Sequence, residues 1–388
     1  MLPNKPAASI ISEDQLLNFL VNALTDEFTL DFGANANVDA EDIFEVLVGA
    51  CADGTSVSTL CENSKESPPE NTILYHLREK FDLSAVEQTG NTLLQTDVLD
   101  TLPEQVEVVV DLHLRPYYGD EDETEGIYHS QAKRGTTAFH AYATLYARVR
   151  NKRYTLAVRR LVDGDTASMV LAEFLGHLDG LDLSVKAVYL DREFYDSKCL
   201  TLLQAHNLAY VMPIVRWGPK IKQELSEGWS RVIDHDLTAT LDGHNWTVEF
   251  PVYIDCTYLK GRYDEHGVAR HGYAADAPFI ETSRQARYHY GKRFGIEASY
   301  RLSEQSIATT TTQESAVRLL YVVVSLLLQN VWRYLHWEYV ATPRRGGRRL
   351  WPWSFKEFIN MIRRAAWTAL AVRRAVPANR PPDDRFYR

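Results

Sequence analysis

Cysteine is scarce in this 388-residue sequence, and its few positions suit neither disulfides nor zinc. The four cysteines, Cys51, Cys61, Cys199 and Cys256, contain no CxxC pair. They exclude a dense disulfide framework, and they argue against a zinc site because the usual ligand spacing is missing. We therefore expect a reduced, cytoplasmic setting.

The sequence also lacks an evident signal peptide or membrane span. The opening MLPNKPAASI has no basic start followed by an apolar run, so no signal peptide is expected. The most apolar stretch, AVRLLYVVVSLLLQNVW, carries Arg318, Gln329 and Asn330 and is typical of a buried core helix. A content of 45% hydrophobic and 24% charged residues indicates a globular protein with room for two or three domains.

Positive charge is scarce in the N-terminal quarter of the chain, and the formal net charge of the whole sequence is −10. Residues 1–105 hold 4 Lys and Arg against 19 Asp and Glu, whereas residues 341–388 hold 12 against 3. This basic tail contains RRGGRRLWPW and MIRRAAWTALAVRR, and the combination of arginines and tryptophans in them suits contact with phosphates. An equally weighted alternative is a terminal amphipathic helix packed on the body. The tail arginines considered for DNA contact are Arg344, Arg345, Arg348 and Arg349.

Residues 1–105 are predicted to be a helical N-terminal domain. The segments SVSTLCEN and ENTILYHLREKF, separated by KESPP, could form a helix-turn-helix that binds DNA ends. Its second helix would present Asn71, Thr72, Tyr75, His76 and Arg78. Any small helical bundle produces the same pattern, and the acidic charge of this region opposes phosphate binding. Binding of DNA by this domain is therefore one of two open interpretations.

From residue 106 the pattern predicts a mixed α/β sheet with flanking helices. VEVVVDLHL, AFHAYATLYARVR and RYTLAVRRL are β-branched or alternating runs, and helices and strands then alternate up to LAYVMPIV. We divide this region into the first part of a core (106–215), a β-rich insertion (216–280) and the last part of the core (281–340), followed by a basic segment (341–388).

Two of the predicted strands lead into an aspartate, Asp111 in VVVD and Asp191 in VYLD. A single aspartate at such a position is most often a turn or helix cap. If the two strands are neighbours, however, both carboxylates reach the same edge of the sheet. Together with a third carboxylate they would form an oxygen site suited to Mg²⁺, or to Mn²⁺ in its place.

The stretch YHYGKRFGIEASYR offers that third carboxylate on a predicted helix. Helical spacing places Tyr290, Arg293, Glu297 and Arg301 on one face. An exposed ladder of helix charge pairs would give the same pattern. Alternatively, Glu297 binds metal while Tyr290, Lys292 and Arg293 hold phosphate oxygens.

With these residues in this order, the chain resembles the DDE transposases of cut-and-paste insertion sequences. It is most similar to the group with a Y-x2-R-x3-E-x6-K signature, and in particular to members from halophilic archaea. The resemblance implies an RNase H-like core in which Asp111, Asp191 and Glu297 are the catalytic, metal-binding triad. It also implies two-metal phosphoryl transfer, with Tyr290, Lys292, Arg293 and Arg301 in contact with DNA.

The sequence departs from that signature at its last position, where Glu304 replaces lysine. On a continuous helix Glu304 would return to the face of Glu297, and Arg301 could supply the missing positive charge. Plain surface charge is the favoured interpretation of Glu304. The resemblance also implies that a tryptophan of the insertion stacks on a flipped base. Trp217, Trp229 and Trp246 are the positions available, although aromatic residues in β domains usually belong to the core.

The predicted function is Mg²⁺-dependent cleavage of DNA at the ends of an element and transfer of the 3′-OH strands into target DNA. The expected partners are double-stranded DNA carrying terminal inverted repeats, target DNA, and a second copy of the chain in a synaptic complex. A nucleoid-associated, cytoplasmic protein without a membrane partner is expected. Two alternatives are a catalytically inactive DNA-binding derivative and an RNase H-like nuclease without strand transfer.

Overall fold

The protein is described here by a computed structural model of residues 11–33, 36–149, 152–241, 244–258, 267–345, 347–349 and 351–373. Within these ranges the side chains at positions 241, 244, 294–299, 343, 347 and 348 are not described. The chain divides into two compact units, one made of residues 1–89 and 303–388 and the other of residues 90–302. The predicted boundaries at 105/106 and 340/341 differ from this division and stay a prediction.

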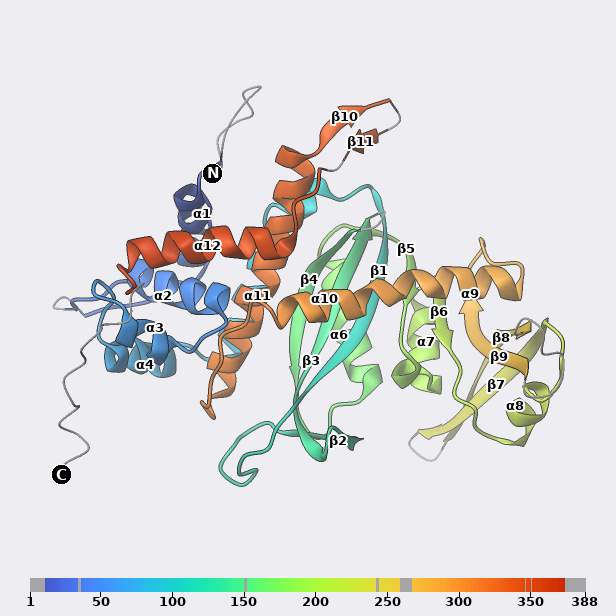
Figure 1. Cartoon of the computed structure of the whole chain (residues 1–388). Helices are drawn as coiled ribbons and strands as arrows, with labels where there is room; N and C mark the ends of the chain where they lie inside the picture. Colours follow the sequence, from blue (N-terminus) through green and yellow to red (C-terminus); the bar gives the residue numbers. More distant parts are fainter. Residues whose placement is uncertain are drawn as a thin grey trace. The chain divides into compact units, whose positions relative to one another are not determined.

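The first unit is helical in its described part, apart from one short hairpin (Figure 1). Its N-terminal helices are α1 (Glu13–Glu27), α2 (Ala40–Asp53), α3 (Val57–Asn63), α4 (Glu70–Glu79) and the start of α5 (Leu83–Gln95). Its C-terminal elements are α11 (Ser315–Leu335), the π-helical turn η5 (His336–Val340), the strands β10 (Thr342–Arg344) and β11 (Gly347–Arg349), and α12 (Phe355–Ala369). Capping boxes at Ser12, Asp39 and Ser354 begin α1, α2 and α12, because each cap side chain satisfies an amide that the first turn leaves unpaired.

The long apolar helix α11 lies in the core of this unit. By length and composition the segment Ser315–Val340 could cross a membrane, but 72% of its most apolar window is buried inside the protein. Its polar residues Ser325, Gln329 and Asn330 are buried too, and Ser325 is hydrogen-bonded to Ser306. The prediction of a buried core helix is therefore confirmed.

The second unit is built on a mixed sheet, which is nine-stranded in the part that the structure describes. The strands are β1 (Gln105–Pro116), β2 (Tyr128–Lys133), β3 (Thr136–Val149), β4 (Lys152–Leu161), β5 (Ser184–Tyr189), β6 (Tyr210–Pro213), β7 (Arg231–Leu241), β8 (His244–Tyr258) and β9 (Val268–Asp276). The path runs β2-β3-β1-β5-β6-β9-β8-β7, and β4 pairs with β3. The β1–β3 and β3–β4 pairs are antiparallel, whereas β1–β5 and β5–β6 are parallel. A mixed sheet with flanking helices was predicted, and it is confirmed.

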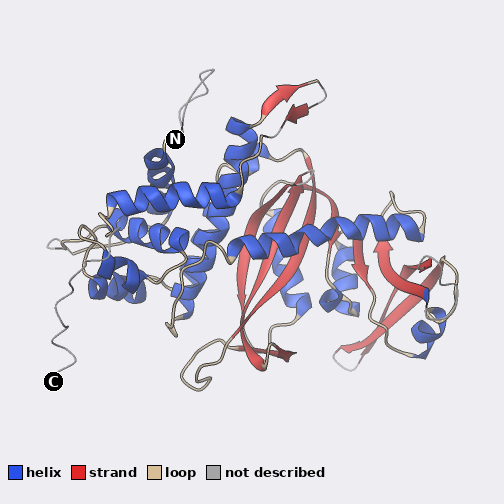
Figure 2. Cartoon of the chain, in the orientation of Figure 1, coloured by secondary structure: helices blue, strands red, loops and turns tan. Residues whose placement is uncertain are grey.

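The helices of this unit lie against the sheet (Figures 1 and 2). They are α6 (Ala167–Asp179), α7 (Ser197–Ala205), α8 (Pro219–Glu224), α9 (Ser283–Gly291) and α10 (Ile296–Ser303), with short 3-10 turns η1 (Leu99–Thr101), η2 (Arg192–Phe194) and η4 (Lys292–Gly295). Helix α10 crosses one face of β1 and β3 (Figure 1), where its Tyr300 contacts His113 of β1 and Thr144 of β3. From α9, Ala286 and Tyr290 pack into a core cluster with Val109, Tyr146 and Tyr189. The sheet and α9 therefore share one hydrophobic core.

The β-rich segment predicted at 216–280 extends the main sheet. It contains α8 and β7 to β9, and β9 pairs antiparallel with β6 from Tyr210↔Asp276 to Pro213↔Tyr273. Gly272 permits this close packing, since a Cβ there would lie 2.3 Å from Ile214 Cδ1. The segment therefore continues the sheet that carries the candidate site.

The prediction of one continuous helix over 288–301 was wrong. Helix α9 ends at Gly291, the 3-10 turn η4 follows, and α10 begins at Ile296. Gly291 and Gly295 bracket the break, and glycine is about 1 kcal/mol less favourable than alanine in a helix interior. Tyr290, Arg293, Glu297 and Arg301 therefore do not form one face of a regular helix.

Candidate active site

The register of the sheet brings Asp111 and Asp191 to the same level on neighbouring strands. The parallel pairing of β1 with β5 runs as far as Val109↔Tyr189. Asp111 lies two residues beyond this last pair on β1, and Asp191 lies two residues beyond it after β5. β1 itself continues to Pro116 against β3, so Asp111 is inside a strand and not at its end. The predicted meeting of the two carboxylates is thus observed.

Arg293 binds both aspartates with one nitrogen. Its Nη2 donates to Asp111 Oδ1 and lies 3.1 Å from Asp191 Oδ2. Its Nη1 donates to the Tyr290 hydroxyl at 3.2 Å. The side chains of Arg293 and Asp111 are only 12% and 10% exposed, whereas that of Asp191 is 34% exposed. Two carboxylates therefore converge on a single cationic group in a largely buried position.

The pKa values of this cluster reflect burial and mutual charge. Burial raises the pKa of Asp111 to about 6, Arg293 opposes that shift, and the charge of Asp191 adds to it. Burial acts to lower the pKa of Arg293, but the charges of Asp111 and Asp191 outweigh it and raise that pKa. Burial also raises the pKa of Tyr290 to about 12, so this residue remains a neutral phenol. The arginine stays charged and offsets the repulsion between the two carboxylates.

Asp191 also fulfils the ordinary role of a cap. Its Oδ1 accepts a hydrogen bond of 2.6 Å from the amide of Arg192 and so begins the 3-10 turn η2. Its other oxygen, Oδ2, faces Arg293. Asp191 therefore caps η2 with one oxygen and meets Asp111 at Arg293 with the other, whereas its role as a metal ligand stays a prediction.

Helix α10 is fixed to the sheet at the level of Asp111. The hydroxyls of Tyr300 and Thr144 are hydrogen-bonded at 2.7 Å, and Thr144 pairs with Asp111 in the β1–β3 ladder. The ring of Tyr300 stacks on His113, with ring centroids 4.3 Å apart. Burial lowers the pKa of His113 to about 4, so the imidazole is a neutral packing surface. These contacts hold the helix that contains Glu297 against the strand that contains Asp111.

The donor types at this site fit a hard divalent cation. Carboxylate oxygens are the protein ligands that Mg²⁺ prefers, and the Asp111–Asp191 pair already converges on one positively charged group. The side chain of Glu297, the third predicted ligand, lies outside the described part of the structure, although its backbone belongs to α10. Among the described residues no group of three His, Cys, Asp or Glu side chains is close enough to hold a metal ion.

Glu304, the last position of the predicted signature, faces solvent. Helix α10 ends at Ser303, so Glu304 lies in the following turn and is exposed. The idea that it returns to the face of Glu297 was wrong, because the helix stops before it. Surface charge is the interpretation that the structure supports. Arg301, in the last turn of α10, is exposed as well.

No protein-family model matches this chain, and no curated protein matches its sequence. Among solved structures it is similar to a piggyBac transposase, determined by cryo-electron microscopy as a synaptic complex with hairpin DNA. The TM-score is 0.53 at 12% sequence identity, and the match covers 95% of this chain and 83% of that chain. The chain shares its fold with a transposase. The narrower Y-x2-R-x3-E-x6-K group and the likeness to halophilic archaea stay predictions.

The basic C-terminal segment divides into two parts with different surroundings. Around the β10–β11 hairpin, Arg344, Arg345 and Arg349 are exposed, and Arg349 lies over the Trp351 ring at 4.9 Å. The side chain of Arg348 lies outside the described residues. By contrast, α12 buries Phe358 and Ile362 against its own unit, and Arg364 pairs with Glu13 of α1. The packed-helix interpretation holds for α12, whereas DNA contact by the hairpin stays a prediction.

Most of the other predicted contacts lie on exposed surfaces. In α4, the second helix of the possible helix-turn-helix, Tyr75 is 59% exposed and Asn71 and Arg78 also face solvent, whereas Thr72 and His76 are half-buried. The tryptophans considered for base stacking, Trp217, Trp229 and Trp246, are 78%, 58% and 51% exposed. The expectation that tryptophans of a β segment belong to the core is therefore wrong for these three.

A buried polar network beside the site was missed in the sequence. Glu107 on β1 pairs with Arg148 on β3 and lies 3.8 Å from Lys292 Nζ. The Tyr189 hydroxyl donates to Glu107 at 3.2 Å, and Lys292 Nζ lies 3.1 Å from His289 Nδ1. The run RVRNKR around the β3–β4 turn was a usable signal, because it places several cations at the end of two buried strands. Lys292, predicted to contact DNA, is part of this network.

Proposed function

We propose that this chain is a DDE-type transposase that cuts DNA at the ends of an element and transfers the 3′-OH strands into target DNA. The observation that carries the proposal is the convergence of Asp111 and Asp191, from two neighbouring parallel strands, on one cationic group. The fold shared with a transposase supports it. The strand order β4-β3-β1-β5-β6 supports the predicted RNase H-like core.

Asp111, Asp191 and Glu297 are the proposed ligands of Mg²⁺ or Mn²⁺. Two such ions, when bound, would activate the attacking water or 3′-OH and stabilise the leaving oxygen. The buried positions of Asp111 and Tyr290 limit the access of bulk water, which strengthens charge interactions at the reacting phosphate. Arg293 supplies a fixed guanidinium beside the carboxylates, and we assign it to the scissile phosphate.

DNA is the proposed partner of both units. Arg344, Arg345, Arg348 and Arg349 would contact the phosphate backbone, and Lys292 and Arg301 would contribute near the site. Joining two element ends requires that they be held together, so a homodimer on DNA is part of the proposal. The similar solved structure is itself a synaptic complex with hairpin DNA, which supports this arrangement.

The direct test is cleavage of a DNA duplex that carries the inverted repeats flanking the coding region. Asp111→Asn, Asp191→Asn and Glu297→Gln should each abolish Mg²⁺-dependent nicking and retain DNA binding. The matched control is Asp234→Asn, because Asp234 is exposed on β7, away from the site. Nicking that persists in a site variant would remove that residue from the proposed triad.

The same reaction separates the proposal from its two rivals. Products in which element ends are joined to a target plasmid support transposition. Nicking without joined products indicates a nuclease, and metal-independent binding without nicking indicates an inactive derivative. Glu297→Gln matters most here, because its side chain is the proposed ligand that the described structure does not place.

A further inference from the structure

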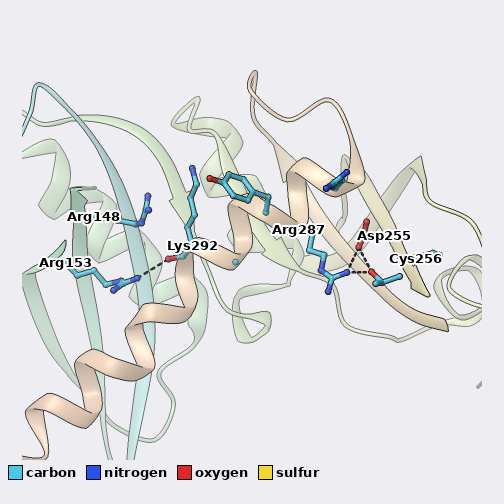
Figure 3. A pocket seen from close by; sticks show the side chains of 10 residues that line it. Arg148, Arg153, Asp255, Cys256, Arg287 and Lys292 are labelled. Carbon is cyan, nitrogen blue, oxygen red and sulfur yellow. Dashed lines mark hydrogen bonds and ion pairs between the residues drawn. The ribbon is translucent and has the colours of Figure 1, made fainter. Parts of the chain in front are cut away.

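A cavity of about 820 Å³ lies beside the candidate active site and has a strongly cationic lining. Among the described residues, five of its side chains are basic and one is acidic. The basic residues are Arg148, Arg153, Arg284, Arg287 and Lys292, and the acidic residue is Asp255. Figure 3 shows Arg148, Arg153 and Lys292 toward one end of the cavity and Arg287 with Asp255 toward the other.

The sheet end of the cavity is rigidly built. Arg148 is held by Glu107, and Arg153 Nη2 donates to the carbonyl of Lys292 at 3.2 Å, the contact drawn in Figure 3. The Nε atoms of Arg148 and Arg153 are buried and make no hydrogen bond within the described part of the chain. Buried donors are normally satisfied, so the two guanidinium groups at this end of the cavity retain unused hydrogen-bonding capacity.

The opposite end comes from α9 and β8. Arg287 Nη1 donates to Asp255 Oδ2 at 2.9 Å and also to Thr257. Arg284, one turn earlier on α9, is exposed. Tyr288 is 67% exposed, and Lys292 Nζ lies 5.2 Å from the centre of its ring. This end therefore combines a fixed arginine, an exposed arginine and an aromatic ring.

The balance of charge leaves this cavity positive. Glu107 offsets Arg148 and Asp255 offsets Arg287, whereas no described carboxylate forms an ion pair with Arg153 or Arg284. Burial and the charge of Arg148 lower the pKa of Arg153. The charged form of Arg153 is therefore destabilised in this cavity, and a bound anion would stabilise it. A cationic cluster of this kind contrasts with the net charge of −10 of the whole chain.

The cavity is connected to the two aspartates through two consecutive residues of the chain. Lys292 lines the cavity, and the following residue, Arg293, binds Asp111 and Asp191. The turn η4 carries both residues, so a strand that places one phosphate at Arg293 can bring a neighbouring phosphate to Lys292.

We propose that this cavity binds the phosphodiester backbone of DNA on one side of the scissile phosphate, through Arg148, Arg153, Arg284 and Arg287. This inference rests on the proposed function for the identity of its ligand. The paired carboxylates orient Arg148 and Arg287, and the aromatic ring of Tyr288 lies where it can contact the sugar or base. Guanidinium groups suit this ligand because their forked donors match phosphate oxygens.

The test measures DNA binding by the full chain in EDTA, so that binding is read without cleavage. A fluorescein-labelled duplex of mixed sequence is titrated at several KCl concentrations, and the slope of log Kobs against log [KCl] is determined by anisotropy. That slope is negative, and each lost phosphate contact reduces its magnitude by about 0.9. Arg284→Ala/Arg287→Ala should therefore reduce that magnitude by about 1 to 2 units.

Two further variants control for charge and folding. Arg284→Lys/Arg287→Lys keeps both charges and should retain most of the slope. Lys198→Ala/Lys222→Ala removes two exposed cations of the same unit outside the cavity and should leave the slope unchanged. If the double alanine variant does not fold by circular dichroism, Arg284→Ala alone is used, since this side chain is exposed, and it should reduce the magnitude of the slope by about 1 unit.

The outcomes separate the cavity from the proposed function. Equal slopes for the wild type and the cavity variant, or an equal loss in the Lys198/Lys222 control, overturn the cavity proposal alone. A wild-type chain that binds no DNA overturns both proposals. A selective loss in the cavity variant supports the cavity, even where the cleavage assay fails and the transposase proposal is lost.

Discussion

The contact of Arg293 with two carboxylates leads to a prediction about stability in the absence of metal. Arg293→Gln removes the cation that Asp111 and Asp191 share. Glutamine retains a hydrogen-bond donor but leaves the two charges unbalanced. We expect a less stable second unit and a stronger stabilisation by Mg²⁺ than in the wild type.

The magnitude follows from the geometry of the pair. Both carboxylates reach the same nitrogen, so their charges are on the order of 6 Å apart and repel by roughly 3 kcal/mol at an effective dielectric constant of about 20. Removing one partner of a fully buried pair costs about 3–5 kcal/mol, but Asp191 is 34% exposed and solvent screens part of that cost. A loss of about 2–4 kcal/mol is expected, which lowers Tm by roughly 5–15 °C for a unit of this size.

The assay is thermal unfolding of both proteins in EDTA and across a MgCl₂ titration. Arg284→Gln is the matched control, because it makes the same substitution at an exposed position of α9. In the variant, Mg²⁺ should restore most of the lost Tm, since it replaces the missing positive charge and binds only the folded state. A loss no larger than that of Arg284→Gln, or an equal Mg²⁺ response in variant and wild type, would refute the assignment of the pair as a cation site.

Three smaller predictions concern other parts of the chain. Glu121 and Asp163 hold the His129 imidazole and raise its pKa, so their contribution to stability is full below a pH of about 6.5 and is lost as the pH rises through the higher folded pKa. An NMR titration gives that pKa, and His129→Gln should weaken the dependence of unfolding on pH in this range. Ser354→Ala removes the N-cap of α12 and should cost about 1 kcal/mol in urea unfolding, whereas an unchanged midpoint would show that the cap contributes nothing. Arg349→Gln in the exposed hairpin should reduce the magnitude of the salt slope of DNA binding by about 0.9 if this residue contacts a phosphate.

The sequence predicted the strands of the site well because their signals are local. The apolar runs before Asp111 and Asp191 indicated two buried strands. Parallel strands are covered on both faces, so their sequences are nearly continuous apolar runs. Placing the strands side by side was a matter of topology, and the structure confirms it through the β1–β5 register. The predicted sheet therefore led directly to a pair of carboxylates.

The helix beyond this pair was predicted wrongly because periodicity was extended across two glycines. Tyr290 and Arg293 are in contact as predicted, but a 3-10 turn and not a regular helix brings them together. The interaction of Arg293 with the aspartates comes from residues about 100 and 180 positions away, which no local pattern contains. Sequence periodicity therefore indicated which residues meet, but not what Arg293 binds.

The cationic cavity could not be predicted from the distribution of charge along the sequence. Counting charges by segment found the basic tail, because its arginines are consecutive in the sequence. The cavity draws its cations from β3, β4, α9 and η4, and each of these elements contributes only one or two of them. Antiparallel pairing brings Arg148 and Arg153 opposite each other, and α9 then adds Arg284 and Arg287 from more than 130 positions away. An acidic chain can therefore present a positive surface beside its carboxylates, because the fold sets the local potential that acts on a phosphate whereas the net charge reports only the sum.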